Sequence, residues 1–532
     1  GAEIGRIKLK YAAKGKNVPR VWGYEESQGT IVFKCTDTAC EFHRGIPVYV
    51  IDEDIYENRP SVVIGTVDKF AMLPWRPESR AIFGLDLNGE RVSSPPGLII
   101  QDELHLISGP LGSMVGLYEA LIEEMCTDRR QDIPILPKII SSTATIRRYA
   151  EQIKALYARE DVALFPPQGL DADDSFFARY ARFEDGTLKP GRVYLGIHAP
   201  GLGSLQTAQV RTFTALLEAP VQMPLQERDP WWTLMIFFNS LRELGTTLSL
   251  FQSDIPDWEK VFRQRTGLDF HQVRGMSNLR EIELTGRLSS DKVPAMIDEL
   301  EVSCSQNETR PVDVCLASSI IEVGIDIDRL SLMAVVGQPK TTSQYIQVTG
   351  RVGRKWQDRP GLIVTLYSAS KPRDRSHFEK FRSYHEQLYA QVEPTSVTPF
   401  CRAVLDRALH AVMVAYVRQV GTEATVSSPW PYPKDMIKTF QDVLLPRITA
   451  VDPEEADSFD RVFRQRADEW RRWERTRWTA SKSNDDIPLL IEAGVYVNPE
   501  WRQFTWQTPT SMRNVDATCQ PRITGLYLDD TQ

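Results

Sequence analysis

Two adjacent carboxylates follow an apolar segment of the sequence. Residues 97–101 read GLIIQ, and Asp102, Glu103, Leu104 and His105 come directly after them. In open parallel sheets, ligands lie beyond the carboxyl ends of the strands. A carboxylate there can hold Mg²⁺ through water, and a second one beside it can orient and deprotonate an attacking water. A solvated strand end followed by a helix cap is the alternative, and these residues alone do not decide between the two.

Two arginines further along the chain are typical of phosphate chemistry. The pattern Q-x-x-G-R-x-G-R is formed by Gln347, Gly350, Arg351, Gly353 and Arg354. Arginine keeps its charge and binds phosphate oxygens with a planar guanidinium group, and residues three apart on a helix share one face. An arginine that reaches across a cleft stabilises charge on a transferring phosphoryl group. The glycines and the glutamine favour this interpretation over surface arginines that close a helix.

Short apolar segments alternate with helix-like patterns in two regions, which predicts βαβ units and parallel sheets. The expected strands are 47–52, 61–65, 97–102 and 138–142, and then 231–240, 312–318, 330–337 and 361–367. Between 160 and 228 the alternation stops, and loops or an insertion are expected. After residue 372 the sequence becomes helical and rich in charge. These patterns predict an α/β fold with two domains in tandem and a largely helical C-terminal region.

The composition limits the class of protein. The 532 residues are 42% hydrophobic and 25% charged, which is typical of a globular protein with two or three domains. The net charge of −8 permits nucleic-acid binding only where basic residues are gathered in a groove. The seven cysteines are mostly scattered, and the longest apolar runs have the length of strands. We therefore expect a cytoplasmic protein without a disulfide framework or a membrane span.

The order of the motifs resembles that of superfamily 2 helicases. Asp102 to His105 is similar to motif II, SSTAT with Ser142 and Thr143 is similar to motif III, and Gln347 to Arg354 is similar to motif VI. Three shorter segments resemble motifs Ib, IV and V, in IGTVDKF with Thr66, FFNS with Asn239 and Ser240, and ASSIIEVGIDID with Ser318, Gly324 and Asp326. Together these motifs extend from residue 60 to residue 370.

The resemblance implies roles for these residues. Asp102 would hold Mg²⁺ through water, Glu103 would activate the hydrolytic water, and His105 would link nucleotide state to the grip on nucleic acid. On the second domain, the ATP-binding residues would be Gly324, Asp326, Gln347, Arg351 and Arg354. Contacts to backbone phosphates would come from Thr66, Ser142, Thr143, Asn239, Ser240 and Ser318, because short polar side chains suit sequence-independent contacts. For each single serine or threonine, a turn or a helix cap is the alternative.

A narrower resemblance concerns segments outside the general motifs. DELHLISGPLGSMVGLYE, KPRDRSHFEKFRSYHEQLY with EPTSVTPF, and PTSMRNVD resemble the DrmA-type helicase subunits of DISARM antiphage systems, and related bacterial helicases that work with DUF1998 proteins. The resemblance implies an ATP-dependent DNA helicase or translocase in antiphage defence, with ATP and Mg²⁺ as cofactors and a DrmB-like, DUF1998-containing partner. The alternative is a non-catalytic nucleic-acid-binding scaffold with a helicase-like fold.

The same resemblance implies two tandem RecA-like lobes. We expect lobe 1, incomplete at its N-terminus, at 1–160, a connector at 161–228, lobe 2 at 229–372 and a helical region at 373–532. The phosphate-binding pattern G-x-x-x-x-G-K-[ST] does not occur in the sequence, and the nearest segment is KGKN at Lys14 to Asn17. We therefore expect the chain to be a fragment that hydrolyses little ATP alone, with a degenerate ATPase as the alternative.

Two further patterns leave alternatives open. Cys35 and Cys40, with His43 after them, could form half of a zinc site, although C-x4-C is a weak pattern and unpaired cysteines are common in protein cores. The segment from Arg461 to Trp478 has arginines interleaved with tryptophans. It could stack on single-stranded bases, or its tryptophans could pack inward while its arginines pair with nearby carboxylates.

Overall fold

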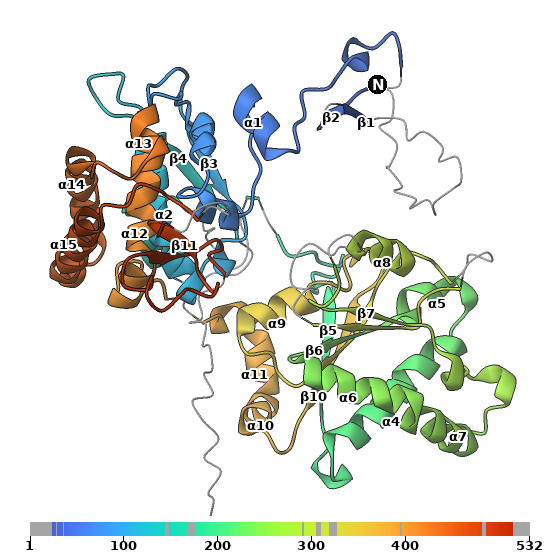
Figure 1. Ribbon diagram of the computed structural model, residues 1–532. Coiled ribbons are helices and arrows are strands. Elements are labelled where there is room, and N and C mark those ends of the chain that lie inside the picture. Colours follow the sequence, from blue (N-terminus) through green and yellow to red (C-terminus); the bar gives the residue numbers. More distant parts are fainter. Residues whose placement is uncertain are drawn as a thin grey trace, which may run out of the picture. The chain divides into compact units, whose positions relative to one another are not determined.

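The chain is described by a computed structural model that separates into two compact units (Figure 1). The first unit comprises Gly1–Ala144, Arg148–Val162 and Thr395–Gln532, and the second comprises Thr145–Arg147 and Ala163–Pro394. The structure describes residues 24–27, 29–35, 37–143, 148–167, 170, 176–177, 179–289, 292–304, 310–318, 327–393, 396–480 and 486–513.

The second unit is built on a sheet of six strands, all parallel. In spatial order the strands are β5 (Arg192–His198), β10 (Gly361–Tyr367), β9 (Leu332–Val336), β6 (Leu234–Phe238), β8 (Val314–Ala317) and β7 (Glu281–Leu284). Every residue of β6, β8 and β9 is buried. Parallel strands that are covered on both faces have continuous apolar sequences, and for this reason the apolar segments of the sequence predicted these three strands.

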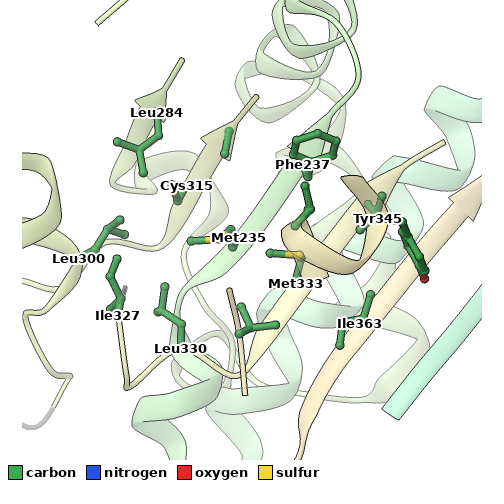
Figure 2. Packing of buried hydrophobic residues seen from close by; sticks show 14 of the residues in the cluster. Met235, Phe237, Leu284, Leu300, Cys315, Ile327, Leu330, Met333, Tyr345 and Ile363 are labelled. Carbon is green, nitrogen blue, oxygen red and sulfur yellow. The ribbon is translucent and has the colours of Figure 1, made fainter. Parts of the chain in front are cut away.

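Side chains of the central strands alternate between two hydrophobic cores. On β6, Met235 and Phe237 pack into one core, and Ile236 and Phe238 pack into the other. Figure 2 shows the first core, where Met235 and Phe237 lie near side chains from β7 to β10. Because successive side chains of a strand point to opposite faces, one short apolar strand supports both layers.

Helices cover both faces of this sheet. Residues of α4 (Leu205–Glu218), α6 (Leu241–Gln252) and α7 (Asp254–Thr266) belong to one core, and residues of α8 (Val293–Leu300), α9 (Thr342–Thr349) and α11 (Phe381–Glu386) belong to the other. The remaining helices of the unit are α5 (Leu225–Trp232) and α10 (Pro372–Glu379). The unit is therefore a three-layer α/β structure.

The expected boundaries of the second lobe differ from the structure. The interval 161–228, expected to be a connector, contains β5, which pairs with β10 along all seven of its residues. The apolar pattern of β5 is interrupted by Gly196, where a Cβ would lie 2.9 Å from the ring of Phe381 on α11. At the other boundary, α10 and α11 belong to the second unit, because α10 packs on β5 and β10. The helical C-terminal region thus begins later than residue 373.

The first unit contains a parallel pair of strands followed by helices. β3 (Leu98–Gln101) pairs with β4 (Lys138–Ser141), and α2 (Gly109–Cys126) and α3 (Tyr149–Tyr157) follow them. An antiparallel hairpin of β1 (Tyr24–Ser27) and β2 (Thr30–Phe33) and a short helix α1 (Asp52–Asn58) precede β3. The strands expected at 47–52 and 61–65 do not form, since these segments pair with no strand in the described part of the unit.

The C-terminal region of the first unit is mostly helical, as expected. It contains α12 (Arg402–Val420), α13 (Glu423–Ser427), α14 (Lys434–Val451), α15 (Ala456–Trp473) and the strand pair β11 (Leu490–Glu492) and β12 (Trp506–Thr508). α12 is buried along most of its length, and it packs against α2, α14 and α15 (Figure 1). Within the described ranges, no helix combines the length and the apolar composition needed to cross a bilayer.

Candidate functional site

The carboxylate of Asp102 lies at the carboxyl edge of the first sheet. Asp102 directly follows β3 and Ser142 directly follows β4, and these parallel strands end side by side. Asp102 accepts a hydrogen bond from the hydroxyl of Ser142 and another from the backbone N–H of Glu103, with Oδ1 3.0 Å from the nitrogen. The residue is exposed to solvent, so its carboxylate is oriented by these two donors and remains accessible.

Glu103 has a left-handed backbone conformation. Its φ is 52° and its ψ is 49°, a region that costs a non-glycine residue about 1–2 kcal/mol. The following 3₁₀ turn, Leu104–Leu106, is held by two backbone bonds of 2.9 Å, from Leu104 N–H to Ser142 C=O and from Leu106 N–H to Glu103 C=O. Strained residues of this kind cluster at active sites, and the Glu103 side chain is still 41% exposed.

His105 connects the two motifs of the first unit. The residue is buried, and its Nδ1 lies 3.2 Å from the hydroxyl oxygen of Thr143 and 3.4 Å from a carboxylate oxygen of Glu103. If Nδ1 carries the proton, it donates to these oxygens, and in the other tautomer it accepts from the Thr143 hydroxyl. Five expected site residues are therefore brought together on this unit, namely Asp102, Glu103, His105, Ser142 and Thr143. Thr66 is exposed at the start of a separate 3₁₀ helix, Val67–Met72.

The arginines of the Q-x-x-G-R-x-G-R segment lie beyond their helix. α9 is capped by the Thr341 hydroxyl, which accepts from Gln344 N–H at 3.2 Å, and it ends at Thr349. Gln347 is on the helix, but Arg351 and Arg354 are in the loop that follows. The expectation that both arginines share a helix face is therefore wrong.

Two glycines explain this loop. Gly353 has a φ of +68°, and a Cβ on it would lie 2.6 Å from the Cα of Gly361 at the start of β10. The N–H of Gly353 donates to Leu330 C=O at 2.8 Å, which fixes the loop against the strand layer. The close backbone approach and the left-handed turn both require glycine, and they prevent α9 from continuing.

Arg192 is a site-supporting residue that the sequence did not reveal. Its guanidinium group donates to Val352 C=O at 3.0 Å and to Gly350 C=O at 3.1 Å. Arg192 on β5 therefore binds the backbone of the loop that contains Arg351 and Arg354, called the arginine loop below. Arg192 lies in the interval expected to be a connector, and it has no recognisable pattern around it. Only the pairing of β5 with β10 brings it beside residues about 160 positions later.

Two of the three phosphate-contact candidates in the second unit, Asn239 and Ser240, make side-chain hydrogen bonds within the unit. Asn239 donates from its amide to Val336 C=O at 3.0 Å and to Gly337 C=O at 3.1 Å, and thereby joins the ends of β6 and β9. Ser240 caps α6, and Ser318 is buried directly after β8. The cap alternative therefore holds for Ser240. Gly324 and Asp326 lie outside the residues that the structure describes.

The cysteine pair near the N-terminus does not complete a metal site in the described residues. The Nδ1 of His43 lies 3.1 Å from the carbonyl oxygen of Cys35, and Cys35 and Cys40 are free thiols. Nowhere in the described ranges do three or more histidine, cysteine, aspartate or glutamate side chains gather as metal ligands would. The expected zinc ligands are thus not supported by this arrangement.

The arginine- and tryptophan-rich segment packs inward. Trp470 is fully buried on α15 and donates from Nε1 to Pro429 C=O at 3.0 Å, and the ring of Trp473 lies 5.3 Å from that of Trp506. Arg471 forms an ion pair with Asp468 at 2.8 Å. These contacts favour the packing interpretation over a surface that stacks on bases.

Comparison with known proteins finds similarity to helicases. The family model of the helicase conserved C-terminal domain matches residues 261–355. DISARM protein DrmA of Bacillus paralicheniformis is 37% identical over 469 residues, which cover 82% of this chain and 41% of DrmA. The ATP-dependent helicase Lhr-Core of Methanocaldococcus jannaschii is 26% identical over 149 residues, covering 27% of this chain and 16% of Lhr-Core.

Among solved structures, the DUF1998 helicase MrfA bound to DNA is similar with a TM-score of 0.45 and 16% identity, covering 74% of this chain and 44% of MrfA. The chain spans about two fifths of the length of DrmA, the curated relative that it matches over most of its own residues. With a helicase C-terminal domain match and this identity to DrmA, the chain resembles the superfamily 2 helicases and, among them, the DISARM protein DrmA.

Proposed function

We propose that this chain carries the hydrolytic residues of an ATP-dependent DNA helicase or translocase that acts in antiphage defence. The observation that carries the proposal is the pair Asp102 and Glu103 at the carboxyl edge of a parallel sheet, with a strained backbone at Glu103. ATP dependence is also supported by the name of Lhr-Core, and a role in defence by the identity to a DISARM protein.

In this proposal Asp102 would hold Mg²⁺ through water. The residue suits the ion, because its carboxylate is exposed and is already oriented by Ser142 and by a backbone N–H. When bound, the ion would neutralise charge on the phosphate oxygens. The Ser142 hydroxyl acts as a positioning group, since it donates to the carboxylate and not to a ligand.

Glu103 would orient the attacking water and take its proton on a carboxylate oxygen. His105, between Glu103 and Thr143, would transmit movements of the motif III segment to this carboxylate. Arg351 and Arg354, with Gln347, Gly324 and Asp326, would bind ATP from the second unit, where the arginines stabilise charge on the transferring phosphoryl group.

The nucleic acid is DNA in this proposal because the resemblance to DISARM helicase subunits implies it. Thr66 and Ser142 are exposed, and Ser240 is exposed at the N-terminus of α6. A DUF1998-containing partner and a cytoplasmic location follow from the same resemblance. The G-x-x-x-x-G-K-[ST] pattern is absent from the 532 residues, so we propose that this polypeptide alone turns over little ATP.

The test is a Glu103→Gln substitution in the natural full-length protein, which keeps the shape of the side chain and removes its basicity. We expect ATP turnover to fall at least about 100-fold while DNA binding is retained. Glu151→Gln is the matched control, because Glu151 is an exposed glutamate of the same unit, with its side chain 70% exposed on α3.

Two outcomes would contradict the proposal. Unchanged turnover in Glu103→Gln would remove Glu103 from the hydrolytic step. A natural protein that binds DNA but has no turnover at all would favour the non-catalytic scaffold. For the 532-residue polypeptide, ATP turnover equal to that of the natural protein would contradict the separate proposal that this polypeptide alone turns over little ATP.

A further inference from the structure

We infer that Gln152 is a positioning residue that holds the backbone of the Asp102–Glu103 segment in its active conformation. The inference rests on the proposed function, because it concerns the glutamate expected to activate water. Gln152 lies on α3, about 50 residues after Glu103, and its side chain is 2% exposed. Nothing in the sequence around it marks it as part of the site.

The amide nitrogen of Gln152 bridges both ends of the turn after Glu103. Its Nε2 donates to Leu104 C=O at 3.0 Å and to Ile107 C=O at 2.7 Å. Leu104 and Ile107 are themselves buried, so these carbonyl groups have little access to water. Buried carbonyl groups need partners. The amide of Gln152 supplies a donor to Ile107 C=O and a second donor to Leu104 C=O, which also accepts from Ile107 N–H at 2.9 Å.

The position of this bridge explains why it matters for Glu103. The left-handed conformation of Glu103 is unfavourable by itself, so the surrounding contacts must maintain it. On one side, Ser142 C=O receives the N–H of Leu104 and the Ser142 hydroxyl donates to Asp102. On the other side, Gln152 fixes the 3₁₀ turn. Without Gln152, the turn could open and Glu103 could return to an ordinary conformation.

Helix α3 is itself anchored, which makes Gln152 a rigid support. Arg447 on α14 is buried, and it donates to Leu156 C=O on α3 at 2.7 Å and to a carboxylate oxygen of Glu123 on α2 at 3.1 Å. Both helices of the site are thus bound to the C-terminal helical region. A positioning residue acts only when its own place is fixed by packing and further hydrogen bonds.

The chain offers a closely matched control in Gln419. This glutamine is also in the first unit and fully buried, on α12. Its Nε2 donates to two backbone carbonyl groups, of Leu73 at 2.8 Å and of Arg76 at 3.0 Å. Replacing Gln419 with methionine therefore also removes two hydrogen bonds from a side-chain amide to backbone carbonyl groups, but at a turn that contains no candidate site residue.

The experiment is hydrogen exchange of Gln152→Met, Gln152→His and Gln419→Met, read on peptides that cover residues 103–108. Amides of Leu104, Leu106 and Ile107 report on the turn, because each makes a bond of 2.9 Å there. We expect Gln152→Met to speed their exchange at least tenfold. Gln152→His keeps one ring N–H donor, so we expect an intermediate effect. Gln419→Met should speed exchange near residues 73–79 and leave 103–108 as in the wild type.

ATP turnover of the natural full-length protein gives a second readout. We expect Gln152→Met to lower kcat at least tenfold with KM for ATP within twofold, and Gln419→Met to change neither. Unchanged exchange at 103–108 in Gln152→Met would overturn the inference, and so would an equal effect of both methionine variants there. If exchange changes as expected but the wild type turns over no ATP, the structural role of Gln152 stands and the proposed function fails. Gln152→His provides the measurement if Gln152→Met does not fold.

Discussion

Replacing Glu103 with glycine tests whether the backbone at the candidate catalytic carboxylate is strained. Glu103 has φ 52° and ψ 49°, where an L-residue pays about 1–2 kcal/mol and glycine pays almost nothing. Glycine loses about 0.5–1 kcal/mol of extra backbone entropy on folding. The lost contact with His105, from a partly exposed carboxylate at 3.4 Å, costs at most a few tenths of a kcal/mol, as is usual for exposed pairs. We expect a net stabilisation of about 0.2–0.7 kcal/mol relative to the wild type.

Two comparisons isolate the backbone contribution. Glu103→Ala removes the same side chain but keeps the strain, so Glu103→Gly should be more stable than Glu103→Ala by about 0.5–1 kcal/mol. Ala158, which ends α3 with a φ of 52°, provides the same change without any site residue. Ala158→Gly should therefore stabilise the first unit by a similar amount and leave ATP turnover unaltered.

The assay is native-state hydrogen exchange of the buried amides of α2, which report on opening of the first unit alone. The difference of about 0.5–1 kcal/mol between Glu103→Gly and Glu103→Ala corresponds to an exchange rate about two- to fivefold slower in Glu103→Gly. ATP turnover by Glu103→Gly should be lost at the same time, since the base is gone. If Glu103→Gly is less stable than Glu103→Ala while Ala158→Gly is stabilised, the strain argument at Glu103 is refuted.

Three further predictions concern buried charges and the arginine loop. Burial raises the pKa of Glu119 to about 7, so the free energy of unfolding falls as the pH rises from 4.5 to 7. Glu119→Gln should therefore raise Tm at pH 8, because it removes an ionisation cost of up to about 3 kcal/mol. An equal gain in Tm at pH 5 would contradict this explanation. Arg274→Met removes the buried guanidinium partner of Asp313 at 3.0 Å, while Arg310 remains at 2.8 Å, and should lower the unfolding free energy of the second unit by about 3 kcal/mol in urea titrations. A loss under about 1 kcal/mol would argue against the pair. Gly353→Ala places a Cβ 2.6 Å from the Cα of Gly361, and should abolish ATP turnover and speed hydrogen exchange of the backbone amide at position 353. Exchange at that amide as slow as in the wild type would refute the close approach.

The apolar runs predicted most of the sheet strands correctly. β3, β4, β6, β8, β9 and β10 all lie within expected segments. For β6, β8, β9 and β10 the reason is burial, because buried parallel strands need continuous apolar residues, whereas β3 and β4 have apolar runs that are only partly buried. β7 was missed since Glu281 and Glu283 interrupt its pattern at the edge of the sheet, and β5 was missed since Gly196 makes room for the Phe381 ring. Edge positions and close packing relax the pattern, and neither can be read from a short window.

The sequence by itself determined which residue types stand at the strand ends, because the pattern of an apolar run followed by carboxylates is local. It identified Asp102, Glu103 and the two arginines without any knowledge of the fold. Only the tertiary structure decided how these groups are held. The left-handed backbone of Glu103 and its support by Gln152, like the hold of Arg192 on the arginine loop, depend on contacts between residues far apart in the chain. Such contacts arise from packing of whole helices and strands, so no local pattern encodes them.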